Sequence, residues 1–235
     1  MSLALLSTDG FLFLARWLHF FFGVIWIGLL YYFNFVQGSF FAETDATTKS
    51  NAIQKLVPRA LWWFRWGAMF TFLTGLVYLA YRGHQGGLDV FRTSWGIAIL
   101  TGGGLGTMMW ANVWFAIWPN QQIVIRSATQ AATGGQAIPE AAAAAKMAGG
   151  MSRVNVLFSI PMLFFMGAAS HLPIEVRPEA NLAILATGLM AIIFGIETCA
   201  LKGKTSLITT IKQVITSGFV LAGILYVVVE ILTKI

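Results

Sequence analysis

Charge is scarce in this chain of 235 residues. Asp, Glu, Lys and Arg make up only 10% of it, whereas a typical soluble domain contains about 25%. Hydrophobic residues make up 57%, which is more apolar surface than a soluble fold of this size can cover with polar groups. These proportions exclude a cytosolic enzyme and a disordered chain, and they predict an integral membrane protein.

Cysteine is nearly absent, because Cys199 is the only one in the chain. A single cysteine excludes an internal disulfide, the usual iron–sulfur clusters, and a haem attached covalently through a Cys-x-x-Cys-His motif. The formal net charge of +6 is not gathered into a long basic run, so it indicates membrane topology rather than nucleic-acid binding. The N-terminus has no basic region and no small-residue cleavage site, so we expect no signal peptide.

Long apolar runs, by contrast, are frequent. A bilayer crossing needs about 20 predominantly apolar residues. Six segments meet this requirement, at approximately residues 11–40, 60–81, 94–118, 154–172, 180–201 and 207–232. We therefore expect one all-α domain over residues 1–235, an integral membrane bundle of about six transmembrane helices.

Prolines suggest where these helices are interrupted. Pro119 is expected to end the third helix, and Pro161 is expected to kink the fourth. In the long connection over residues 119–153, Pro139 predicts the start of a short surface helix over residues 139–146.

Lysine and arginine are distributed unevenly between the two sides of the expected bundle. The connections after the first, third and fifth segments contain nine of them: Lys49, Lys55, Arg59, Arg126, Lys146, Arg153, Lys202, Lys204 and Lys212. The opposite side contains four: Arg82, Arg92, Arg177 and Lys234. Because positively charged loops remain in the cytoplasm, we expect a multi-pass protein of the bacterial inner membrane, surrounded by lipid, with both termini in the periplasm.

Two histidines fall within the expected spans. His19 lies early in the first segment and His171 closes the fourth, so this orientation places both near the periplasmic face. Two imidazoles from different helices can ligate one b-type haem iron, and ionisable side chains inside a membrane are often functional. Gly23 and Gly167 would leave room for the macrocycle on the same helical faces, and Arg16 would bind a propionate. The alternative is that both histidines hydrogen-bond to neighbouring helices and that Arg16 extends to lipid head groups.

Other unusual residues have simpler interpretations. His84, in a glycine-rich outer loop, is expected to be solvated. The glycine-rich run at residues 101–106 is expected to allow close helix packing, although a glycine face against a porphyrin is an alternative.

A polar layer is also expected near the cytoplasmic face. Arg65 and Glu197 lie at similar depth there, together with Asn112 and Asn155. The two charged side chains would either pair with one another or extend to the membrane surface. A quinone or proton site at this level is a further alternative.

Several motifs along the chain are similar to one known family. They are, in order, Arg16-Trp-Leu-His19 with Gly23-Val-Ile-Trp-Ile-Gly28, then Trp63-Phe-Arg-Trp66, Gly106-Thr-Met-Met-Trp-Ala-Asn112 and Ser170-His171-Leu-Pro173. Over roughly residues 10–175 the chain resembles the membrane-bound urate hydroxylases, the urate oxidase N-terminal domain family. The resemblance implies redox chemistry at a bacterial inner membrane. Members often continue into a periplasmic c-type cytochrome domain, so this chain would be a divergent, short member without it.

The chain also departs from the family's pattern. Leu100 stands where the family tends to have a histidine in the third helix. Residues 153–157 read Arg-Val-Asn-Val-Leu, where the family shows a run similar to Arg-His-Asn-Asn-Tyr. His19 and His171 are retained, but the lost polar groups argue against a complete urate-oxidising site.

These observations lead to one preferred function and two alternatives. The preferred function is electron transfer by a b-type haem protein, with His19 and His171 as axial ligands. Its partner would be a periplasmic c-type cytochrome or another membrane subunit. The alternatives are a cofactor-free structural subunit of a larger membrane complex and a urate-oxidising enzyme that uses a separate cytochrome c.

Overall fold

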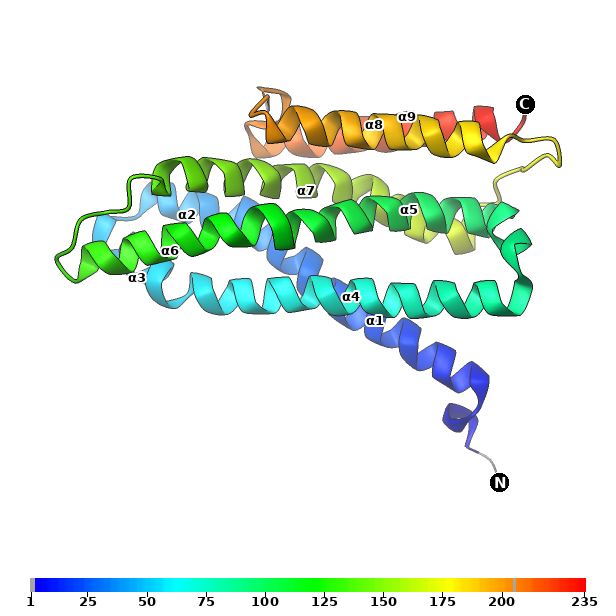
Figure 1. The fold of residues 1–235 in the computed structure, drawn as a ribbon, viewed down its shortest axis with the longest axis horizontal. Coiled ribbons are helices and arrows are strands. Elements are labelled where there is room, and N and C mark those ends of the chain that lie inside the picture. Colours follow the sequence, from blue (N-terminus) through cyan, green and yellow to red (C-terminus); the bar gives the residue numbers. More distant parts are fainter. Residues whose placement is uncertain (1–2, 205) are drawn as a thin grey trace.

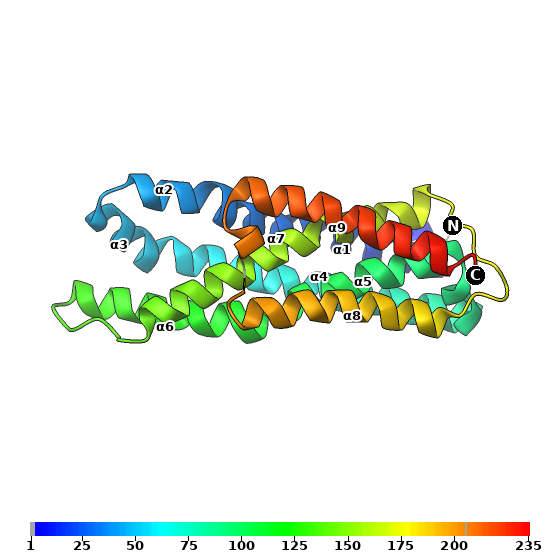
Figure 2. The same ribbon diagram turned by 90° about the horizontal axis from the view of Figure 1, so that it is seen from above.

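The computed structural model of the protein describes residues 3–204 and 206–235. Within these ranges every regular element is a helix and no strand is present, which confirms the all-α prediction. The long helices are α1 (Thr8–Tyr31), α4 (Val57–Gly86), α5 (Ser94–Ala111), α7 (Ala141–His171), α8 (Leu182–Leu201) and α9 (Ile211–Leu232). All but α1, which crosses the others obliquely, run along a shared long axis, and both described ends of the chain lie toward the same end of the bundle (Figure 1, Figure 2).

All six expected apolar segments are helical, but they differ in how well they suit a membrane. Among the described residues, four helical stretches are long and apolar enough to cross one: Thr8–Glu43, Ala141–His171, Leu182–Leu201 and Ile211–Leu232. The other two lie in α4, which contains three Trp and three Arg, and in α5, which contains five Gly and two Trp. These residues lower the hydropathy of the two helices without preventing the helical conformation.

The third segment continues to Ala132, well beyond its expected end near residue 118, whereas the first ends at Glu43, close to its expected end near residue 40. Each contains a π-helical turn. The turn at Tyr32–Gln37 joins α1 to α2 (Gly38–Glu43), and the turn at Asn112–Ile117 joins α5 to α6 (Trp118–Ala132). The expectation that Pro119 ends the third helix is therefore wrong. Pro119 lies in the first turn of α6, where its missing N–H group is tolerated.

The connection before the fourth segment is shorter than expected. Residues 133–140 are the only non-helical part of it, and α7 begins at Ala141 and runs for 31 residues. Residues 141–146 of the separate surface helix expected over residues 139–146 are instead the first turns of α7, because the alanines there favour continuous helix. Pro161 lies inside this helix and is buried.

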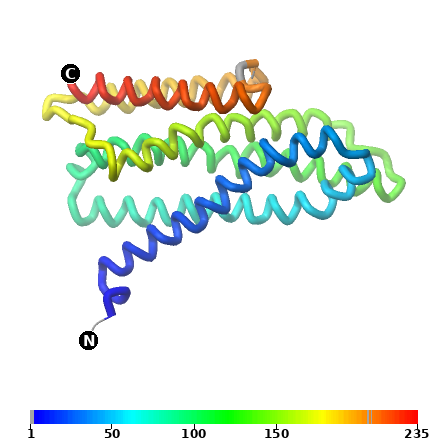
Figure 3. The backbone as a smooth tube through the Cα atoms, turned by 180° about the vertical axis from the view of Figure 1, so that it is seen from behind, coloured from blue at the N-terminus to red at the C-terminus, as the bar shows by residue number. Residues whose placement is uncertain are grey.

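Helix α7 is the centre of the bundle, with buried residues along its whole length. Helix α5 approaches it closely at Gly102, where an added Cβ atom would lie 3.3 Å from the backbone atoms Met162 O and Met166 N. This contact confirms the expected packing role for Gly102, whereas a Cβ atom at Gly103 or Gly104 would have no atom within 4 Å. Helices α8 and α9 form a pair on one side of α7, and the N-terminal half of α1 diverges from the bundle on the other (Figure 1, Figure 3).

Short helices link the longer ones. Helix α3 (Ala46–Lys55) links α2 to α4, and the Asp45 carboxylate caps its N-terminus. The 3-10 helix at Leu88–Arg92 links α4 to α5. Large apolar side chains on the outer faces of α1, α8 and α9 are exposed, as is expected for helices that face lipid.

Candidate functional site

Helix α4 fixes the orientation of the His19 imidazole. Its Nδ1 atom lies 2.9 Å from the Thr71 carbonyl oxygen and 3.3 Å from the Thr74 hydroxyl oxygen. Because a carbonyl oxygen only accepts hydrogen bonds, Nδ1 carries the proton and donates it. Nε2 then holds the lone pair, and no described residue hydrogen-bonds to it. This arrangement, with one ring nitrogen held by a backbone carbonyl, is typical of metal-ligating histidines.

A glycine on α4 makes this close contact possible. If Gly75 had a Cβ atom, it would lie 3.2 Å from His19 Cε1. Gly75 stands one helical turn after Thr71, so a side chain there would shield the carbonyl that holds Nδ1. The close contact between α1 and α4 at His19 therefore depends on the lack of a side chain at Gly75.

Arg16 is also held by α4. It lies one turn before His19, and its Nη2 group donates a hydrogen bond to the Tyr78 hydroxyl. The guanidinium carbon lies 4.8 Å from the centroid of the Tyr78 ring, within the range of a cation–π interaction. Arg16 itself is exposed, so the guanidinium remains accessible to an anionic group.

The glycine expected to give clearance on α1 lies against α4 as well. The nearest atom to a Cβ at Gly23 would be the Thr71 methyl group, at 3.9 Å. The structure therefore gathers Arg16, His19 and Gly23 along one face of α4.

His171 and Gly167 are separate from this group. His171 is the last residue of α7 and is exposed, and a Cβ at Gly167 would have no atom within 4 Å. No hydrogen bond or ring contact joins His171 to His19. The C-terminal end of α7 and the N-terminal half of α1 nevertheless lie toward the same end of the bundle (Figure 1).

Sequence reasoning missed the residues of α4 that complete the site. They are Thr71, Thr74, Gly75 and Tyr78, whose spacing of three, four and seven residues places them on one helical face. That spacing was visible in the sequence as a small and polar stripe within an apolar segment.

A second polar cluster is buried at another level of the bundle. Asn112 Nδ2 donates hydrogen bonds to Asn155 Oδ1 at 3.0 Å and to Glu197 Oε2 at 3.1 Å. Asn155 Nδ2 donates to the Met109 carbonyl oxygen at 2.9 Å. The cluster joins the second π-helical turn to α7 and α8, and its three side chains are buried.

Arg65 does not take part in this cluster, so of the two alternatives for Arg65 and Glu197 the ion pair is not formed. The Arg65 guanidinium carbon lies 3.8 Å from the ring centroid of Trp118 and 5.3 Å from that of Trp114. Arg65 faces the tryptophans beside α4, so cation–π contacts replace the ion pair. Glu197 takes its hydrogen bond from an amide instead.

The side chains available as ligands limit which metal ions or cofactors the protein could bind. In the described part of the chain, no group of three or more His, Cys, Asp and Glu side chains is arranged to bind a metal ion. His19 does fit an axial ligand of haem, because its tautomer leaves Nε2 free and Arg16 stands on the same face as a partner for a carboxylate.

Comparison with known proteins identifies the family. No curated protein and no solved structure gives a significant match to the chain. The family model described as urate oxidase N-terminal matches residues 88–229. The match runs from the 3-10 helix before α5 into α9, so it includes His171 and the buried Asn112–Glu197 cluster but not the α1–α4 contact around His19. Since it covers more than half of the chain, the protein belongs to the urate oxidase N-terminal family.

Proposed function

We propose that this protein is a six-span b-type haem protein of the bacterial inner membrane that transfers electrons to a periplasmic c-type cytochrome or a partner subunit. The observation that carries the proposal is the His19 imidazole, which is held through Nδ1 by the Thr71 carbonyl and has no described partner at Nε2. Family membership supports a role in redox chemistry.

The arrangement of the connections supports six spans with both termini in the periplasm. The α2–α3 region, the α6–α7 loop and the α8–α9 turn lie toward one end of the bundle, and the described termini lie toward the other (Figure 1). The end with these three connections is the one whose loops are richer in Lys and Arg. The positive-inside rule therefore favours a cytoplasmic location for it.

Each candidate residue would have its own role in binding haem. His19 would bind the iron through Nε2, and His171 would supply the second ligand from the end of α7. Arg16 would donate hydrogen bonds to a propionate. Gly167 leaves the surface of α7 beside His171 free of side chains, whereas Gly23 packs against Thr71 of α4. When bound, haem would supply reversible one-electron chemistry, and two histidine ligands favour electron transfer because no open iron position remains.

The test is a reduced-minus-oxidised absorption spectrum of the purified protein. We expect a b-type α-band that is lost in His19→Ala and kept in His84→Ala, a matched control because His84 is exposed at the end of α4. A band that survives His19→Ala would remove the ligand assignment. A colourless wild-type protein that co-purifies with a stable membrane partner would support a cofactor-free subunit instead.

A second candidate function is urate oxidation coupled to a separate cytochrome c, which family membership favours. Membranes that contain the protein would then reduce an added c-type cytochrome when urate is supplied. The same membranes without urate, and membranes without the protein, are the controls.

A further inference from the structure

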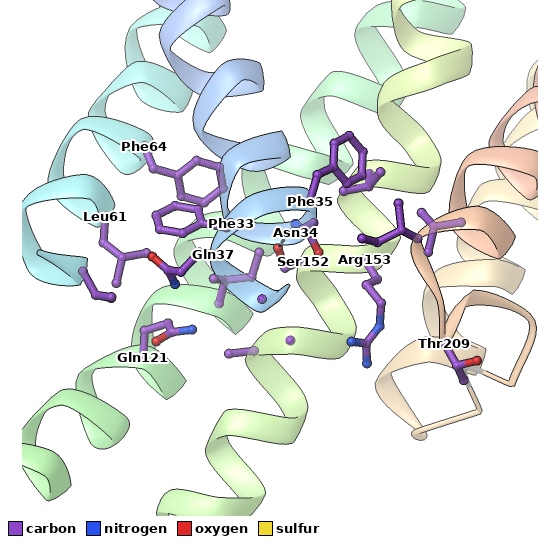
Figure 4. A pocket seen from close by; sticks show the side chains of 18 residues that line it. Phe33, Asn34, Phe35, Gln37, Leu61, Phe64, Gln121, Ser152, Arg153 and Thr209 are labelled. Carbon is purple, nitrogen blue, oxygen red and sulfur yellow. Dashed lines mark hydrogen bonds between the residues drawn. The ribbon is translucent and has the colours of Figure 1, made fainter. Parts of the chain in front are cut away.

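A cavity lies in the half of the bundle away from His19. It encloses about 250 Å³ between the first π-helical turn, the start of α4, α6, α7 and the start of α9 (Figure 4). Because His19 contacts α4 between Thr71 and Gly75, and the cavity reaches α4 only between Val57 and Phe64, the two sites are distinct.

The cavity contains a positive charge without a counter-charge. Arg153 of α7 lines it, and the Arg153 Nε atom is buried with no hydrogen-bond partner. None of the residues that line the cavity is acidic. No described carboxylate forms a salt bridge with Arg153. A guanidinium that is partly removed from water is unfavourable without an anionic partner.

Two glutamine amides line the side of the cavity away from Arg153 (Figure 4). The Gln37 Oε1 atom is buried and also has no hydrogen-bond partner. Gln121 faces the same space from α6, on the side of the cavity near Gln37 (Figure 4). Asn34 Nδ2 donates to Ser152 Oγ at 2.7 Å, which fixes the side chains between these amides and Arg153.

The side of the cavity away from Arg153, next to Gln37, is mainly apolar (Figure 4). The rings of Phe33 and Phe64 pack edge to face with their centroids 5.5 Å apart, and Leu61 lies beside them (Figure 4). A ligand that satisfies both walls must therefore have an anionic end and an apolar end. The volume lies below the roughly 300–1,000 Å³ of pockets for drug-sized molecules, so the bound part must be small.

We propose that this cavity binds a small amphiphilic oxyanion, a carboxylate or phosphate attached to an apolar group, with Arg153 as its cationic partner. The planar guanidinium fork matches the two oxygens of a carboxylate or phosphate and forms charge-assisted hydrogen bonds with them. Such a ligand would come either from the aqueous phase or from a phospholipid head group, because both offer this chemistry at the end of a membrane span. The site is independent of haem binding.

Two neighbouring glycines allow a matched steric test. Gly149 lines the cavity, Gly150 does not, and a Cβ atom at either position would have no atom within 4 Å. Gly149→Leu would therefore place a side chain in the cavity, whereas Gly150→Leu would make the same change beside it. Both replace glycine inside a helix, which favours folding.

The measurement is calorimetric titration of the purified protein in detergent. The probes are benzoate, as a soluble carboxylate, and dihexanoyl phosphatidylglycerol, as a short-chain phospholipid. We expect saturable binding of at least one probe, abolished by Gly149→Leu and kept by Gly150→Leu. Binding of benzoate indicates a soluble ligand, and binding of the phospholipid alone indicates a lipid site.

A charge variant tests the role of Arg153. Arg153→Gln is expected to weaken binding by about tenfold or more, since it removes a charge-assisted hydrogen bond. Arg126→Gln, which changes an exposed arginine of α6, should leave binding unchanged. The proposal is overturned if neither probe binds, if Gly149→Leu binds as well as Gly150→Leu, or if a folded Arg153→Gln protein binds as well as the wild type.

Discussion

Asn112 and Glu197, which are 85 residues apart in the sequence, are joined by a 3.1 Å hydrogen bond inside the bundle. The bond links the π-helical turn after α5 to the inner face of α8. Asn112 also holds Asn155 of α7, so one amide group connects three helices. Removal of this amide would leave two buried acceptors without a donor.

Asn112→Leu is therefore expected to lower the free energy of unfolding by about 2–4 kcal/mol, since an unsatisfied buried polar group costs about 1–3 kcal/mol. Thermal unfolding in detergent, followed by circular dichroism, measures the change. Glu197→Gln is the comparison, because its amide oxygen still accepts from Asn112, and it should lose clearly less stability. Equal losses in the two variants would contradict this role of the Asn112 amide.

The close approach of α5 to α7 predicts a second stability effect. Gly102→Val would bring side-chain atoms against the backbone of α7 near Met162, and overpacking of this kind costs about 1–3 kcal/mol. Gly104→Val is the matched control, because a Cβ at Gly104 would have no atom within 4 Å. Thermal unfolding of the two variants measures the difference, and a Gly102 variant as stable as the control would contradict the contact.

Gly75 provides a test of how α4 orients His19. Gly75→Leu is expected to displace the imidazole from the Thr71 carbonyl, since even a Cβ atom would lie 3.2 Å from His19 Cε1. If the proposed function is correct, the intensity of the b-type α-band per mole of protein would fall, or the wavelength of the band would shift. Gly28→Leu should leave the spectrum unchanged, because a Cβ at Gly28 of α1 would have no atom within 4 Å. A normal spectrum from the Gly75 variant would show that this contact does not position a ligand.

Asp45, outside the spans, makes α3 sensitive to pH. Hydrogen bonds from the Thr48 side chain and from the backbone N–H groups of Thr47 and Thr48 lower the pKa of the Asp45 carboxyl below its ordinary value. The capping contribution is therefore complete above the ordinary pKa of about 4 and is lost as the pH falls through the lower pKa of the folded state.

Hydrogen exchange of the α3 amides between neutral and acidic pH would reveal this loss as faster exchange, after correction for the intrinsic rate. Asp45→Asn retains a capping oxygen but does not titrate. The variant should remove the acid-dependent step while leaving α3 capped at neutral pH. A step that persists in this variant would assign it to another group.

Hydropathy was sufficient to predict the helical segments but not their ends. All six apolar stretches are helical, as expected because a run of about 20 apolar residues has the length of a helix that crosses a bilayer. The expected end of a helix at Pro119 and the expected gap between residues 146 and 154 are both absent, for local reasons. A π-helical turn accommodates the chain before Pro119, and the alanines after Glu140 extend α7 beyond the apolar run.

The sequence also predicted the depth of polar residues better than their partners. Arg65, Asn112 and Glu197 were correctly expected to lie within helices, but their pairing depends on how each helix is rotated about its axis. That rotation places Arg65 against Trp118 and turns Glu197 toward Asn112. The cavity beside Arg153 could not be predicted for the same reason, since five segments of the chain enclose it.

The position of the side chains that line the cavity depends on the number of residues in the two π-helical turns. Each turn contains one residue more than an α-helical turn, so the chain after it is rotated by about 100° relative to an uninterrupted helix. Gln37 lies in the first turn and Gln121 lies four residues after the second, and both face the cavity. Deletion of a single residue from either turn would leave the helix long and apolar yet rotate its glutamine away. Substitutions in the wall of the cavity are therefore expected to be tolerated more readily than a single insertion or deletion in these two helices.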